Sequence, residues 1–183
     1  MAGTDEGVLG IGWWLEDSGR WESLRFEGAE DEDGMPLDRR WQDRRDVLEA
    51  LALVEGAVDH GFARFLLEQE ILFHEHVWGF SHGAEIAALL VAEHQRPEDV
   101  WLLWDALGTS FDTWCGLPHQ LIESAGGTAN TIAYVTASEH EARDGLLEHL
   151  RESEEMTGEE AAEFIAGRRE YYATVFLQLA ADE

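Results

Sequence analysis

Residues 97–125 read PEDVWLLWDALGTSFDTWCGLPHQLIESA, and they hold three of the eight tryptophans and the single cysteine. Their apolar side chains recur with the period of one face of an α-helix: Val100, Leu103, Trp104 and Leu107. Gly108 is expected to end this helix, Thr109 to cap a second short helix, and Gly116 to end that one. The segment therefore predicts short, aromatic-rich helices joined by tight turns, which is typical of the packing centre of an all-helical domain.

The length and composition indicate one globular domain spanning residues 1–183. A chain of 183 residues with 45% hydrophobic residues is long enough to bury a sizeable core. Its longest apolar run, Ile86 to Ala92, is far shorter than the roughly 20 residues that a membrane span needs. A single cysteine cannot form an internal disulfide, and the first residues are acidic and polar. We therefore expect a cytoplasmic protein without a membrane segment.

The net charge is the most unusual property of the sequence. The chain has 39 acidic and 12 basic residues, a net charge of −27, and every basic residue is arginine. Such a charge repels nucleic acid and anionic membranes and favours cationic partners. The absence of lysine suggests a high-GC genome or a salt-loving host that needs an acidic surface. The alternative to any specific use of the charge is that it only keeps the protein soluble.

Residues 8–26 are the least helical stretch of the sequence. Two aromatic segments flank a turn signal at Asp17-Ser18-Gly19, so residues 8–26 predict a small β-hairpin. Residues 27–36, EGAEDEDGMP, predict a mobile acidic loop. The domain would then consist of a hairpin and loop over 1–36 and a helical body over 37–183.

The helical body shows clear amphipathic patterns and start signals. The cleanest pattern runs from Asp59 to Gly79, and Leu37 to Val58 predicts a helix before it. Ser81 is expected to cap the next helix, while Ser138 and Thr157 each begin a capping box. Residues 130–138 fit either a short helix or a strand. The predicted fold class is mainly α, an irregular helical bundle or a short α-solenoid with a small N-terminal β-hairpin.

One short motif suggests hydrolytic chemistry. Gly79-Phe80-Ser81-His82-Gly83 fits G-x-S-x-G and precedes a good helix, so it resembles the nucleophile elbow of α/β-hydrolases. That elbow needs a buried strand before the serine, but His74-Glu75-His76 occupies this position at the end of a helical pattern. We expect Ser81 to be a helix cap without a catalytic histidine in reach, and keep a serine hydrolase using Ser81 as an alternative.

Metal and cysteine chemistry are weaker possibilities. Glu70 and His74 are four residues apart and share a helix face, which makes them the alternative metal ligands. Cys115 is expected to be a small buried hydrophobe, although a Cys115–His119 pair is conceivable. The sequence contains no P-loop and no GxGxxG, so we expect neither a metal nor a cofactor.

Residues 96–125 loosely resemble uncharacterised all-helical proteins of high-GC actinobacteria. The resemblance rests on the helix around Trp104 followed by Ser110-Phe111-Asp112-Thr113-Trp114-Cys115-Gly116. Some such small acidic proteins are similar to immunity proteins of toxin systems. The resemblance brings no activity or catalytic residue with it.

The acidic residues gather toward the two ends of the sequence, with a net charge of −8 over residues 1–36 and −9 over 138–183. We expect a non-enzymatic binding protein. It would neutralise or mask a basic protein partner, as an immunity protein or inhibitor does. If the two ends meet in space, they form one negative surface. Its expected partner-binding residues are Glu30, Asp31, Glu32, Asp33, Glu152, Glu154, Glu155, Glu159 and Glu160. The alternatives are the hydrolase and a self-associating helical scaffold, and the sequence leaves the oligomeric state open.

Overall fold

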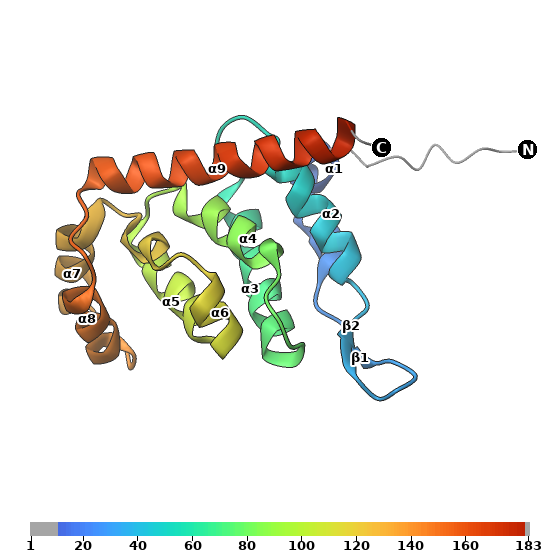
Figure 1. Ribbon diagram of the computed structural model, residues 1–183, viewed down its shortest axis with the longest axis horizontal. Helices are drawn as coiled ribbons and strands as arrows, with labels where there is room; N and C mark the ends of the chain where they lie inside the picture. Colours follow the sequence, from blue (N-terminus) through green and yellow to red (C-terminus); the bar gives the residue numbers. More distant parts are fainter. Residues whose placement is uncertain (1–10, 182–183) are drawn as a thin grey trace, which may run out of the picture.

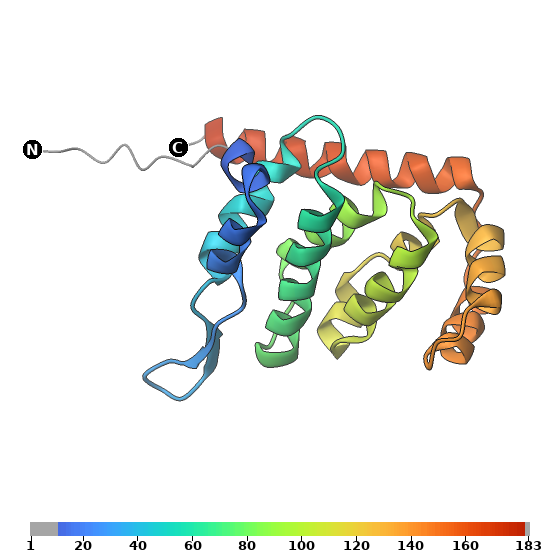
Figure 2. The same cartoon turned by 180° about the vertical axis from the view of Figure 1, so that it is seen from behind.

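The computed structural model describes residues 11–181 as a row of helices crossed at one end by a long helix. The helices of the row lie side by side in Figure 1, and the long C-terminal helix α9 (Gly158–Ala181) runs across one end of them. The reverse view in Figure 2 shows the same arrangement. The mainly helical fold class with a small hairpin is confirmed. Within the described residues, no helix is both long and apolar enough to cross a membrane.

The hairpin predicted for residues 8–26 is wrong within the described residues; residues 8–10 lie outside them. The chain forms helix α1 (Ile11–Glu16) and the 3₁₀-helix η1 (Ser18–Leu24), and Asp17 caps η1 by accepting the Gly19 N–H. The turn signal therefore begins a helical turn. The Trp21 indole packs against Phe62, so this segment covers part of the helical body.

The hairpin lies in the segment expected to be an acidic loop. Strands β1 (Gly28–Glu30) and β2 (Pro36–Asp38) pair antiparallel, with Ala29 opposite Leu37. Asp31 closes the turn because its carboxylate accepts the main-chain N–H groups of Asp33 and Met35. The acidic residues at 31–33 thus form the tip of a hydrogen-bonded hairpin.

Three helices and a short central unit form the middle of the row. The helices are α2 (Trp41–Ala52), α3 (His60–His76) and α4 (His82–Ala92). The central unit contains η2 (Pro97–Asp99), α5 (Val100–Gly108), α6 (Phe111–Gly116) and η3 (His119–Glu123). Ser110 caps α6, and not Thr109 as predicted. The Thr109 hydroxyl instead donates to the Asp105 carbonyl. The backbone of Thr109 keeps a helical conformation at the end of α5.

The C-terminal third begins with α7 (Gly127–Ala137), which settles the ambiguous segment as a helix, and α8 (Arg143–Glu152). Ser138 does not cap α8, because its hydroxyl donates back to the Tyr134 carbonyl and α8 begins five residues later. Thr157 does make the predicted capping box with Glu160 at the start of α9.

The core is centred on α2, α3, α4 and α5 and extends to η3, α7, α8 and α9. Every residue of α4 from Gly83 to Ala92 is buried, which makes this helix the centre of the packing. Leu103, Phe65 and Phe73 are buried. Trp104 and Phe176 pack against the core but are only half-buried, because each side chain also faces solvent.

Candidate functional site

Two hollows on the surface contain some of the residues that the sequence singled out, Ser81 in the first and Glu154, Glu155 and Glu160 in the second. The first, here called the aromatic groove, lies between α2, the α3–α4 loop, α4 and the C-terminal half of α9. The second, here called the acidic pocket, lies beside η3 and the α8–α9 loop. Each is built differently and offers a different chemistry.

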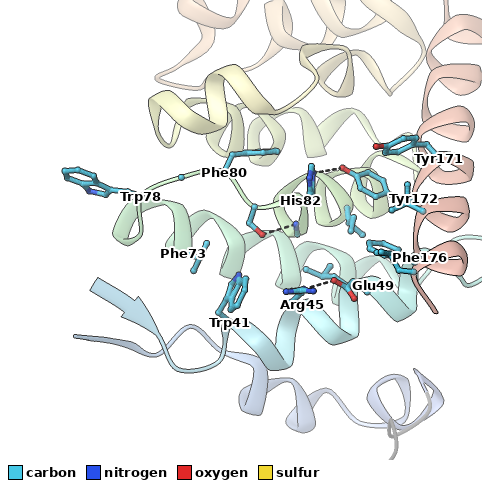
Figure 3. Close-up of a pocket in the computed structure, with 17 residues that line it drawn as sticks. Trp41, Arg45, Glu49, Phe73, Trp78, Phe80, His82, Tyr171, Tyr172 and Phe176 are labelled. Carbon is cyan, nitrogen blue, oxygen red and sulfur yellow. Dashed lines mark hydrogen bonds and ion pairs between the residues drawn. The ribbon is translucent and has the colours of Figure 1, made fainter. Parts of the chain in front are cut away.

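The aromatic groove has a volume of about 530 Å³ and a mainly apolar lining. Figure 3 shows its aromatic side chains in sequence from Trp78, at one end, to Tyr171, Tyr172 and Phe176 of α9 at the other. The rest of the lining comes from α2, α3, the α3–α4 loop, α4 and α9: Trp41, Arg45, Leu48, Glu49, Phe73, Gly79, Phe80, Ser81, His82, Gly83, Ile86, Val175 and Leu179. Such a mostly apolar hollow with few polar groups is typical of a binding site.

A chain of hydrogen bonds joins α4 to α9 beside the groove. The Tyr172 hydroxyl donates to Glu85 Oε2 at 2.6 Å. It also lies 3.3 Å from His82 Nδ1, as Figure 3 shows. Arg168 pairs with the other oxygen of Glu85. Burial and the Glu85 carboxylate both raise the pKa of Tyr172, so this phenol stays protonated and holds the two helices together.

Ser81 lines the aromatic groove as the N-cap of α4. Its hydroxyl oxygen accepts the Gly83 N–H at 3.1 Å, and its own main-chain N–H donates to His74 Nε2 at 3.1 Å. His74 Nδ1 lies 2.8 Å from the Glu70 carbonyl oxygen, so the neutral ring donates there and accepts from Ser81. Within the described residues, no histidine nitrogen bonds the Ser81 hydroxyl, and a helix and a loop precede it in place of a strand. This geometry agrees with the capping role predicted for Ser81.

Glu70, an alternative metal ligand, belongs to a buried ion-pair cluster. Glu70 Oε1 accepts from Arg44 Nε at 3.0 Å, and Arg44 Nη1 lies 2.6 Å from Asp38 Oδ2 without the alignment of a hydrogen bond. Burial raises the pKa of Glu70 although Arg44 opposes the shift. Among residues 11–181, no three His, Cys, Asp or Glu side chains are arranged to hold a metal ion. Both alternative ligands, Glu70 and His74, already have protein partners.

Cys115 is exposed, which corrects the expectation of a buried thiol. It lies in α6, whose buried residue is Thr113, and so points away from the core. His119 turns to Trp114 instead, with Nε2 2.9 Å from the Trp114 carbonyl oxygen. The structure thus gives His119 a main-chain partner.

The acidic pocket collects three of the predicted partner-binding residues, Glu154, Glu155 and Glu160. Its volume is about 400 Å³, and the buried carboxylate of Glu123 completes a set of four. Burial raises the pKa of Glu123, whereas the exposed carboxylate of Glu160 has its pKa lowered by hydrogen bonds from Thr157. Within the part of the chain that the structure describes, no arginine lines this pocket. The arrangement offers carboxylate oxygens to a cation.

The loop that carries Glu154 and Glu155 is fixed to the start of α7. The Thr128 N–H donates to the Met156 carbonyl at 2.9 Å, the Met156 N–H donates to the Thr128 hydroxyl at 2.8 Å, and that hydroxyl donates to Glu123. Gly127 permits this close approach, since a Cβ there would lie 2.4 Å from the Met156 oxygen. These contacts hold the loop in one geometry before any ligand binds.

The structure separates the two acidic clusters that the sequence grouped together. Glu30 lies in β1 and Asp31, Glu32 and Asp33 form the hairpin tip, while Glu152 ends α8 and Glu159 begins α9. The hairpin and the α8–α9 loop lie toward opposite ends of the long axis in Figures 1 and 2. The single negative surface that required the two ends to meet is therefore absent among the described residues.

Sequence reasoning missed the aromatic groove. Trp41 and Trp78 belong to no motif, and Tyr172 lines the groove although it is also buried in the core. The available signal was the run Tyr171 to Ala181, YYATVFLQLAA, which has no charged residue and too many apolar residues for one buried face.

Comparison with known proteins gives no further guidance. No protein-family model, curated protein or solved structure matches this chain.

Proposed function

We propose that this protein is a non-enzymatic binding protein that masks a basic protein partner, as an immunity protein or inhibitor would. The observation that carries the proposal is the acidic pocket, where Glu123, Glu154, Glu155 and Glu160 surround one hollow. An arginine or lysine side chain of the partner would enter it and meet several carboxylates at once.

Two further features support this role. The pocket loop is held by its contacts with Thr128, so binding does not have to order it, and preorganisation of this kind strengthens affinity. The net charge of −27 attracts a basic protein over a long range and raises its rate of encounter.

The test is the binding of an oligo-arginine peptide, measured by calorimetry. Any strongly acidic protein attracts such a peptide, so the control must carry the same charge change elsewhere. The pocket variant is Glu154→Gln with Glu155→Gln, and the matched control is Glu32→Gln with Asp33→Asn at the hairpin tip. All four side chains are exposed, and no hydrogen bond of their carboxylates holds the fold within the described residues.

We expect the pocket variant to bind the peptide about tenfold more weakly than the unchanged protein, a loss of about 1.4 kcal/mol. The hairpin control should lose at most about twofold, because it changes only the long-range field. Equal losses in both variants would mean that the acidity acts only as general charge, and the proposal would fail.

A further inference from the structure

We propose that the aromatic groove is a second docking site, which receives the apolar face of an amphipathic helix whose flanks are basic. The proposal rests on the proposed function, because it takes this helix to belong to the basic partner. It adds a separate surface of different chemistry on the other side of the molecule from the acidic pocket, near α2 and the C-terminal half of α9 (Figure 1).

The apolar surface continues beyond the hollow, which favours a protein segment over a small enclosed ligand. Trp78 is 89% exposed, and Leu179 at the opposite wall is 59% exposed, although both line the groove. Leu177, 62% exposed, extends the same charge-free part of α9. Large apolar side chains left in water around a hollow are typical of interaction sites.

The shape of the groove suits a helix. Its walls are themselves helices, α2 and α4 with α9 across them, and the aromatic row extends along the hollow in Figure 3. A helix that lays residues i, i+3, i+4 and i+7 into such a groove is a recurrent mode of recognition. Rigid aromatic anchors carry much of the binding energy in interfaces of this kind.

Charge selects the occupant. A second copy of this chain could offer its own apolar α9 segment, but two molecules of net charge −27 repel each other. Arg45 is the one arginine that lines the groove among the described residues, and it is paired with Glu49 at 2.7 Å, so the groove presents little net positive charge to an acidic segment. A helix with basic flanks gains from the same field that opposes self-association.

The experiment uses a designed helical peptide of leucine and lysine with all leucines on one face. One control peptide has the same composition in scrambled order, and a second has glutamate in place of lysine. The groove variant is Trp78→Ala with Leu179→Ala. The matched control is Phe111→Ala with Met35→Ala, two exposed side chains on other elements and outside the groove lining. Because all four side chains are exposed, none of these changes should unfold the protein.

We expect the amphipathic lysine peptide to bind at least tenfold more tightly than either control peptide, and the groove variant to lose about tenfold while the matched control loses little. The oligo-arginine affinity should be the same in the groove variant as in the unchanged protein.

Equal binding of ordered and scrambled peptides, or equal losses in both variants, would overturn the groove proposal. A dimer in sedimentation that the groove variant dissociates would also overturn it, since the occupant would then be a second copy. Loss of oligo-arginine selectivity alone would refute the proposed function and leave the groove standing.

Discussion

At the residue scale, the feature hardest to foresee is Arg44. Its neighbours Arg40 and Arg45 form exposed ion pairs, which is what the charge pattern of this segment suggests for all of them. Arg44 is instead fully buried between Asp38 of the hairpin and Glu70 of α3, and its guanidinium also donates to the Leu24 carbonyl. One side chain thus connects η1, the hairpin, α2 and α3.

Replacing Arg44 should therefore be costly. Arg44→Leu leaves two buried carboxylates without their cation, and we expect the free energy of unfolding to fall by about 3–5 kcal/mol. Arg45→Leu, one residue away, removes a partly exposed ion pair with Glu49 and a cation–π contact with Trp41, and should cost only about 1 kcal/mol. Urea unfolding of both variants makes the comparison, and similar small losses would show that the buried cluster does not hold the hairpin to the helices.

His74 gives the protein a pH dependence with a defined sign. Burial, the largest cause, lowers the pKa of His74 from its ordinary value of 6.5, so the folded protein keeps the ring neutral while the unfolded chain takes up a proton more readily. The stability that His74 contributes is then present above about pH 6.5 and is lost as the pH falls through the lower folded value. Protonation of Nε2 would also remove the acceptor of the Ser81 N–H.

The free energy of unfolding should thus decrease between about pH 7.5 and about pH 5.5. His74→Gln should make this slope shallower, though burial lowers the pKa of His94 and His149 as well, so part of the slope should remain. The exposed His76, two residues along the same helix, supplies the control variant His76→Gln. An unchanged slope in His74→Gln would contradict this role.

At the element scale, the sequence predicted helices well where an apolar stripe and a start signal agree. The segment from Asp59 forms α3 with Asp59 as its cap, and Ser81 caps α4. The failures have physical reasons. Residues 11–24 are helical because Asp17 caps η1 and Trp21 packs on Phe62. A local sequence pattern cannot show the Trp21–Phe62 contact, because the two residues are far apart in the sequence. The hairpin depends on Asp31 closing its turn and on the distant contact of Asp38 with Arg44.

The two predicted capping boxes provide an internal comparison. Thr157 exchanges hydrogen bonds with Glu160 at the start of α9, whereas Ser138 bonds back to α7. Thr157→Ala should lower the free energy of unfolding by about 1 kcal/mol, the usual cost of a lost N-cap. Ser138→Ala should cost less than half as much, because no helix start depends on it. Thermal unfolding of both variants is the measurement, and the reverse order of losses would mean that the capping geometry is misassigned.

At the scale of the whole molecule, charge and position must be considered together. The sequence predicted the acidity and identified Glu154, Glu155 and Glu160, but it could not show that they share a pocket with the buried Glu123. Nor could it show that the acidic hairpin tip lies far from them (Figure 1). Both facts follow from the long-range arrangement of the helices, which places η3 and α7 against the start of α9.

The most direct test of the central claim is to map where a cation binds. Amide shifts of the ¹⁵N-labelled protein would be followed by NMR during titration with the oligo-arginine peptide. We expect saturable shifts concentrated at residues 119–123 and 153–160, with small shifts at the hairpin tip. Shifts of similar size at the hairpin tip and over the other acidic surfaces, without saturation, would contradict a localised binding site.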